Sequence, residues 1–261
     1  MARTILTDHL TLNVTKQGND TTGDGSLSSP FLTIQHAIKV VYETLDVGGE
    51  YWVKIQVGDG TWAENIKVAY PLPGAGEGSY LRISGNVTTP ANCFLKPTSN
   101  ECVKVYYWAN VEIEGFRFEA PTRGIYAYDG GIAEIVGKCE FGPCANHIYA
   151  AMGGEVKLHV PYDVAGGAAN HFICNGAHIA LSSAVNIAQP NLSFSNAFIQ
   201  ADRGADINLR TSSFTGQTAS VTGKRWASDG NAIIRMSAGV NPDTHIPGNA
   251  NGTKTFGGEA G

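Results

Sequence analysis

Two glutamates occupy equivalent positions in two similar segments, and paired carboxylates carry out most glycoside hydrolysis. Glu112 and Glu134 are 22 residues apart, and each precedes a core isoleucine, Ile113 or Ile135. On neighbouring strands their backbones would lie about 5 Å apart, close to the carboxyl separation of retaining glycosidases. The alternative is a solvated charge ladder in which Lys157 offsets the two acids. We favour the ladder, so these two glutamates are candidates for catalysis but no catalytic residue is predicted.

Asparagine and histidine recur at one position of the later segments. Asn146, Asn170 and Asn196 each stand two residues before the core residue of a strand. Stacked amides can hydrogen-bond between neighbouring strands and tolerate a tight turn, so an asparagine ladder is predicted. His147 and His171 follow two of these asparagines. Two stacked imidazoles could bind a metal ion, but no third ligand is evident. We therefore expect exposed turn histidines, no metal site and no other cofactor.

A strip of apolar side chains is predicted on the outside of the molecule. It consists of Tyr126, Tyr149, Ile173 and Ile199, which follow the core residues of four segments. An outward column that faces water is normally polar. Three explanations remain open: an interface with another subunit, a covering loop, or a surface on which sugars stack. The first is preferred, because closed assemblies bury such strips.

The elements that position these residues are short strands that repeat. From Tyr51 onward, alternating apolar and polar residues are separated by Gly, Asn, Pro and Asp. One core column consists of Ala133, Val156, Ile179, Ile207 and Ile233, in steps of 23, 23, 28 and 26 residues. A second consists of Ile125, Ile148, Phe172 and Phe198. Such steps predict an all-β, right-handed parallel β-helix of about eight coils, each adding roughly 4.8 Å.

The two ends of the chain differ from the repeats. Residues 1–48 hold a strand, a polar loop and an amphipathic helix, which Ser29 and Pro30 are expected to open. Its apolar face consists of Ile34, Ala37, Ile38 and Val41. This helix would cover the open end of the strand stack. Residues 49–237 form the parallel β-helix, and residues 238–261 a Gly-rich C-terminal tail.

Composition excludes several classes of protein. The 261 residues carry a net charge of −5, whereas proteins that bind nucleic acid usually carry a basic stripe. No apolar run approaches the roughly 20 residues of a membrane span, and the first residues lack the apolar stretch of a signal peptide. The five cysteines show no metal-binding spacing and are expected to be reduced, mostly buried thiols.

Several stretches resemble the pectin-lyase-like superfamily of parallel β-helices. They are residues 18–38 (GNDTTGDGSLSSPFLTIQHAI), 53–68 (VKIQVGDGTWAENIKV) and 111–118 (VEIEGFRF). The C-terminal residues 246–258 (IPGNANGTKTFGG) resemble the ends of some phage tail proteins. The resemblance implies the β-helix fold, and it is closest in character to phage or prophage tail spikes. The superfamily's methylesterase motif, Gly-x-x-Asp-Phe-Ile-Phe-Gly, is not found.

The sequence therefore favours a structural, receptor-facing virion protein. It would form a homotrimer, bind a host surface glycan or join other virion proteins, and contact neither nucleic acid nor membrane. Synthesis in the host cytoplasm and release by lysis would require no signal peptide. The alternative is a depolymerase, a lyase or hydrolase that acts on a bacterial surface polysaccharide.

Overall fold

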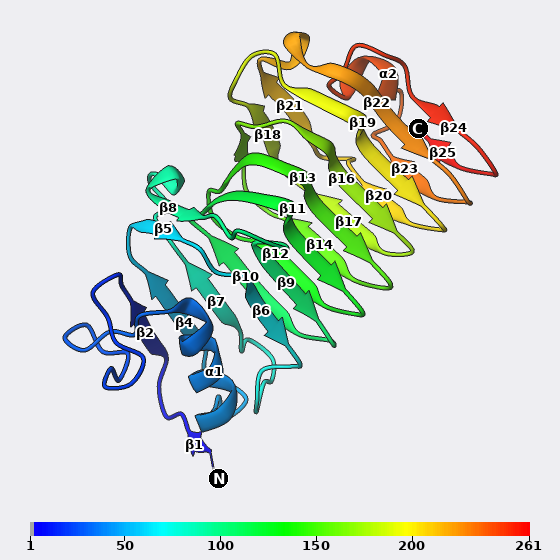
Figure 1. Cartoon of the computed structure of the whole chain (residues 1–261). Helices are drawn as coiled ribbons and strands as arrows, with labels where there is room; N and C mark the ends of the chain where they lie inside the picture. The colour runs from blue at the N-terminus through cyan, green and yellow to red at the C-terminus, as the bar shows by residue number, and fades with distance from the viewer. Residues whose placement is uncertain (1–2) are drawn as a thin grey trace.

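The chain is wound into a parallel β-helix of about eight turns, which confirms the predicted fold class. The computed structural model describes residues 3–261. Each turn contributes strands to successive faces of an elongated stack, and equivalent strands of neighbouring turns pair in parallel (Figure 1). Apolar side chains from all the faces fill one continuous core.

The faces are distinguished by their strand partners. The first face is a ten-stranded sheet of β2 (Leu10–Val14), β4 (Val53–Val57), β7 (Leu81–Ser84), β10 (Asn110–Glu114), β12 (Ile132–Ile135), β14 (Glu155–Leu158), β17 (His178–Leu181), β20 (Asp206–Asn208), β23 (Ile233–Arg235) and β25 (Glu259–Ala260). The second comprises β5 (Gly60–Trp62), β8 (Cys93–Leu95), the beginnings of β11 (Arg117–Tyr128) and β13 (Glu140–Ala151), β15 (Tyr162–Val164), β18 (Ala184–Ile187) and β21 (Ser213–Gly216). The third comprises β6 (Ile66–Ala69), β9 (Val103–Tyr106), the ends of β11 and β13, β16 (Ala168–Asn175), β19 (Ser193–Asp202), β22 (Thr222–Ser228) and β24 (Thr253–Lys254).

The first predicted core column is correct except at its last member. Ala133, Val156, Ile179 and Ile207 pair in register along the first face and are buried. The next partner of Ile207 is Ile234, while Ile233 pairs with Asp206 and faces outward. Two adjacent isoleucines satisfy the alternation equally well, so only backbone pairing decides which one enters the core.

The second core column is displaced in the same way. Ile125, Ile148 and Phe172 pair in register on the third face, but the next partner is Ile199 and not Phe198. The register between β16 and β19 shifts by one residue at a point before Phe172, between Ala168 and Asn170. The extra residue makes Ile199 the next member of the column, while Phe198 is buried in the core beside it.

Helix α1 (Ile34–Thr44) buries the predicted face and packs against β2, β4 and β6 at the N-terminal end (Figure 1). It begins later than predicted, with Thr33 and not Ser29 as its N-cap. Phe31 is held extended by a bridge to Val14. The Asp20 carboxylate accepts hydrogen bonds from the Thr33 backbone and hydroxyl at 3.0 and 2.6 Å. The loop of the N-terminal motif thus fixes where the helix starts.

The two ends of the described chain pair differently. Near α1, β1 (Thr4–Ile5) and β3 (Leu45–Asp46) form a separate two-stranded sheet. At the other end, β24 and β25 extend the third and first faces, and the short helix α2 (Pro242–His245) packs against β22. Residues 238–261 are therefore not a tail that leaves the stack. They supply its last strands.

All five cysteines are free and buried, as predicted. Burial raises the pKa of Cys139 to about 12, so this thiol stays protonated at neutral pH. Within residues 3–261, no helix has the length and apolar character needed to cross a lipid bilayer.

Candidate functional site

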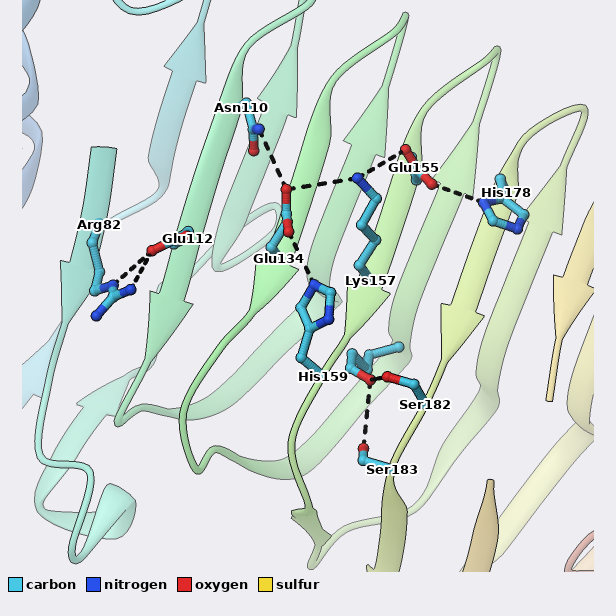
Figure 2. Close-up of polar contacts among 11 residues, drawn as sticks. Arg82, Asn110, Glu112, Glu134, Glu155, Lys157, His159, His178, Ser182 and Ser183 are labelled. Carbon is cyan, nitrogen blue, oxygen red and sulfur yellow. Dashed lines mark hydrogen bonds and ion pairs between the residues drawn. The ribbon is translucent and has the colours of Figure 1, made fainter. Parts of the chain in front are cut away.

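The predicted catalytic candidates lie together on the first face, but each is already neutralised (Figure 2). Glu112 and Glu134 pair in register on β10 and β12. Arg82 grips Glu112, with Nη2 and Nε 2.6 and 2.7 Å from Oε2. Glu134 receives Lys157 Nζ at 3.7 Å and His159 Nε2 at 3.0 Å. This geometry matches the charge ladder, and neither carboxylate is left free to act as nucleophile or general acid.

The ladder continues toward the C-terminus. Lys157 also contacts Glu155 at 3.4 Å, and Nδ1 of His178 lies 2.9 Å from the other oxygen of Glu155 (Figure 2). Partly exposed pairs of this kind contribute roughly 0–1 kcal/mol each. The charge ladder therefore makes the first face polar and adds little to the free energy of unfolding.

A second pair of acids, which the sequence reasoning missed, lines a cleft of about 440 Å³ near β4 and β7. Asp59 accepts a hydrogen bond from Asn86 at 2.9 Å, and Glu114 accepts one from Ser84 at 2.8 Å. In the part of the chain that the structure describes, neither carboxylate has a cation within 4.0 Å. The two residues are 55 positions apart and belong to different strand columns, so spacing alone did not pair them.

His147 and His171 are not the exposed turn residues that the sequence predicted. Both are completely buried. The chain bends where it passes from the second face to the third, and there consecutive residues such as His147 and Ile148 both enter the core. The two Nδ1 atoms are 2.9 Å apart, and Tyr162 Oη lies 2.8 Å from Nε2 of His171.

The donors and acceptors of this buried chain depend on the imidazole tautomers. If Tyr162 donates to His171 Nε2 and His171 Nδ1–H donates to His147 Nδ1, the proton on His147 Nε2 has no acceptor in the described chain. If the chain runs the other way, the tyrosine hydroxyl has none. Burial lowers the pKa of His147 to about 3 and, with the neighbouring imidazole, the pKa of His171 well below its usual range. Both rings are neutral at pH 7. Residues 3–261 contain no group of three or more side chains that could hold a metal ion.

The predicted asparagine ladder joins two of its three members. Asn196 Nδ2 donates to Asn170 Oδ1 at 3.3 Å, and the buried Asn170 donates to the Ala197 carbonyl at 3.0 Å. The backbones of Asn146 and Asn170 are in register, but no hydrogen bond joins these two side chains within the described chain. The amides fix the corner between two turns, which is a structural role.

The predicted outward strip is shorter than expected. Tyr126, Tyr149 and Ile173 pair in register and are partly exposed on the third face. The next position belongs to Gln200, because Ile199 points into the core and is 0% exposed. The one-residue register shift causes this error too. The strip therefore comprises two tyrosines, one isoleucine and a polar end.

The two tyrosines belong to a larger group of aromatic and basic side chains. The Tyr126 and Tyr149 rings stack with centroids 5.2 Å apart. The Arg123 guanidinium lies 4.4 and 4.8 Å from these two centroids, and Lys104 Nζ lies 5.5 Å from that of Tyr126. Burial raises the pKa of Tyr126 to about 12, so its hydroxyl stays protonated. Rings held under cations in this way form a rigid, partly polar surface.

Next to this group, an exposed aromatic ridge follows the turns that leave the third face. It consists of Tyr70, Tyr107 and Trp108, with exposed fractions of 61%, 42% and 73%. Tyr70 and Tyr107 stack with centroids 5.3 Å apart. All three have left-handed backbones, with φ of 68°, 53° and 62°. Equivalent turns further along have the same conformation at Asp129, Met152 and Arg203, and at Gly176.

Tyr106 links the ridge to two depressions in the surface. One, of about 330 Å³, is lined by Tyr42, Tyr70 and side chains of α1. The other, of about 300 Å³, is lined by Lys67, Asn100, Glu101, Lys104, Tyr106, Arg123 and Tyr126. We call the ridge and the two depressions together the aromatic face.

Comparisons with protein-family models, with curated proteins and with solved structures give no match for this chain. Function must therefore be argued from the aromatic face itself.

Only part of the aromatic face could be predicted from the sequence. The run Tyr106-Tyr107-Trp108 at the end of a strand is visible in the sequence, and three adjacent aromatics at a turn are unusual. Their exposure and left-handed backbone could not be seen there. The approach of Tyr70, 37 residues upstream of Tyr107, depends on the stacking of one turn on the next.

Proposed function

We propose that the protein is a receptor-facing virion protein of the phage tail-spike type, which binds a glycan of the host surface through the aromatic face. The virion location rests on the resemblance of the C-terminal segment to the ends of phage tail proteins, in a chain whose N-terminal motif resembles the pectin-lyase-like superfamily. Glycan binding rests on the chemistry of the face. Aromatic rings offer flat apolar surfaces for sugars, while neighbouring polar groups can bond to the hydroxyls.

The observation that carries this proposal is the exposure of three neighbouring aromatic side chains in the ridge. Tyr70, Tyr107 and Trp108 are 61%, 42% and 73% exposed, and the first two rings stack with centroids 5.3 Å apart. Their left-handed backbone, which costs a non-glycine residue of order 1 kcal/mol or more, also occurs at Met152 and Arg203. The rings and not the backbone therefore distinguish these turns, and a ligand that stacks on the rings would cover them.

Replacement of Trp108 by glycine separates a binding role from a structural one. We expect Trp108→Gly to lower affinity for host glycans about tenfold or more, because burial of a large apolar side chain contributes roughly 1.5–3 kcal/mol. The melting temperature should stay unchanged or rise, since glycine relieves the strained backbone. Glycan binding is measured by biolayer interferometry and stability by calorimetry.

Met152→Gly is the matched control for this experiment. Met152 is 62% exposed and has a φ of 50° in an equivalent turn, but it brings no ring to the ridge. Its replacement should leave glycan affinity unchanged. Loss of stability without loss of binding in Trp108→Gly would mean that the ridge serves the fold alone.

The homotrimer expected from the sequence stays a prediction. The strip on which it was based now ends at Ile173, and Gln200 replaces its last apolar member. If the strip is a subunit interface, Tyr149→Lys together with Ile173→Lys should convert a trimer to a monomer in sedimentation velocity, with an unchanged β signal in circular dichroism. A wild-type chain that sediments as a monomer at micromolar concentration would refute the interface.

The depolymerase alternative would have to use the cleft of Asp59 and Glu114, because Glu112 and Glu134 are paired with cations. We expect no shortening of capsular polysaccharide or lipopolysaccharide by the purified protein, as measured by size-exclusion chromatography of the glycan. Depolymerisation that disappears in Asp59→Asn or Glu114→Gln, and persists in Glu134→Gln, would assign an enzyme to that cleft instead.

A further inference from the structure

The smaller depression of the aromatic face concentrates positive charge on an otherwise acidic protein. Lys67, Lys104 and Arg123 line it, with Glu101 as the single carboxylate, which leaves two net positive charges. The whole chain has a net charge of −5. Attraction of an anion to this place is therefore a local property of the depression and not of the protein's overall field.

The three cations are largely unpaired. Lys67 and Lys104 stand side by side in register on β6 and β9, an arrangement of like charges that destabilises a sheet. Among residues 3–261, neither ammonium group has a carboxylate within 4.0 Å or a side-chain hydrogen bond, and Arg123 reaches only Glu101, at 4.0 Å. The described part of the chain therefore supplies too few carboxylates to neutralise Lys67, Lys104 and Arg123.

The aromatic side chains at this depression indicate what kind of molecule would carry the anionic group. Lys104 Nζ lies 4.9, 5.2 and 5.5 Å from the centroids of Tyr106, Tyr128 and Tyr126, so the ammonium is held among three rings. Asn100 adds an amide and the almost buried Glu101 adds an acceptor for hydroxyl groups. A group that combines a carboxylate, several hydroxyls and an apolar ring face satisfies all of these at once.

We infer that this depression binds the carboxylate-bearing residue of an acidic glycan, with Lys67, Lys104 and Arg123 around the carboxylate and Tyr106 beside the sugar ring. The inference rests on the proposed glycan-binding function and adds the substrate class. Glu101 favours a carboxylate over a phosphate monoester, because its own charge opposes the second charge of that group.

The test uses glycans that differ only in their carboxylates. The purified chain is measured by biolayer interferometry against hyaluronan, alginate and polysialic acid, each beside its carboxyl-reduced form, and against dextran and dextran sulfate. We expect at least one carboxylated glycan to bind about tenfold or more tightly than its reduced form, as loss of one charge-assisted hydrogen bond of roughly 1.5–3 kcal/mol implies. That difference should shrink as salt is raised.

Substitutions then locate the binding site. Lys67→Gln together with Lys104→Gln should remove the preference for the carboxylated form, while Lys157→Gln, on the first face, should leave it intact. Circular dichroism and melting temperature verify that the variants fold, and removal of two adjacent like charges should not lower stability.

Each remaining outcome is decisive. Equal binding of carboxylated and reduced glycans, or a preference that survives the double substitution, overturns the acidic-sugar inference and leaves glycan binding standing. Tighter binding of dextran sulfate than of every carboxylated glycan overturns the choice of carboxylate. Binding of no glycan at all overturns the proposed function, and the inference with it.

Discussion

Acidification from pH 7 to pH 5 is expected to lower the free energy of unfolding by about 4 kcal/mol, through the two buried histidines alone. Burial lowers the pKa of His147 to about 3 and that of His171 well below its usual range. In the unfolded chain both imidazoles titrate near pH 6.5. Below that pH the unfolded state therefore binds two protons more than the folded state, and each contributes a slope of ~1.4 kcal/mol per pH unit.

The sign of the effect follows from these shifts. A depressed histidine pKa means that the stabilisation is fully present above pH 6.5 and is lost as the pH falls from 6.5 toward 3. Protonation of both rings would also place an N–H donor on each of the two Nδ1 atoms, which lie 2.9 Å apart. The loss is a large share of the 5–15 kcal/mol that is typical of a folded domain.

Urea unfolding at constant ionic strength between pH 7 and pH 5 measures this slope. His147→Leu together with His171→Leu should flatten it, whatever the stability of that variant at pH 7. His9→Gln removes an exposed histidine and should leave the slope as it is. Imidazole nitrogen shifts in NMR that report protonation of His147 near pH 6 would contradict the expectation.

Replacement of Ile179 by aspartate is expected to abolish folding or to destabilise the chain by more than about 4 kcal/mol. Ile179 is completely buried and lies between Val156 and Ile207 of the neighbouring turns. The substitution deletes apolar packing and places a carboxylate where no cation can reach it. Because each turn of a solenoid rests on its neighbours, the defect interrupts the core in the middle of the stack.

Ala180→Asp is the matched control on the same strand. Ala180 faces outward and pairs in register with Lys157, so a carboxylate there meets water and a cation. Its effect on the free energy of unfolding should stay within about 0.5 kcal/mol. Soluble expression and chemical denaturation compare the two variants. Equal stability of Ile179→Asp and Ala180→Asp would contradict the placement of Ile179 in the core and of Ala180 on the outside.

The charge ladder illustrates what spacing can predict about a site. Glu112 and Glu134 were expected side by side because they precede equivalent core residues, and they do pair in register. Arg82, which neutralises Glu112, was not expected from the sequence. It lies 30 residues upstream, beyond a loop whose length hides the register of β7 against β10. One repeat length was enough to predict that Glu112 and Glu134 are neighbours. Predicting their cationic partners required the length and path of every loop between the strands.

The sequence by itself determined the architecture. Apolar residues that recur at steps of 23 to 28 positions can be buried together only if equivalent segments stack, which yields parallel strands around one core. The buried face of α1 was determined in the same way, since its 3.6-residue period depends only on local geometry.

Only the tertiary structure decided which of two adjacent residues faces inward and what the surface presents. Ile233 and Ile234 are equivalent to an alternating pattern, and only the strand pairing places Ile234 in the core. Phe198 and Ile199 are both buried, and the one-residue shift decides that Ile199 continues the column. His147 entered the core because the strand bends at a corner, where alternation fails. The aromatic face arose from residues of different turns whose proximity is set by the stacking of the coils, and local sequence carries no record of that stacking.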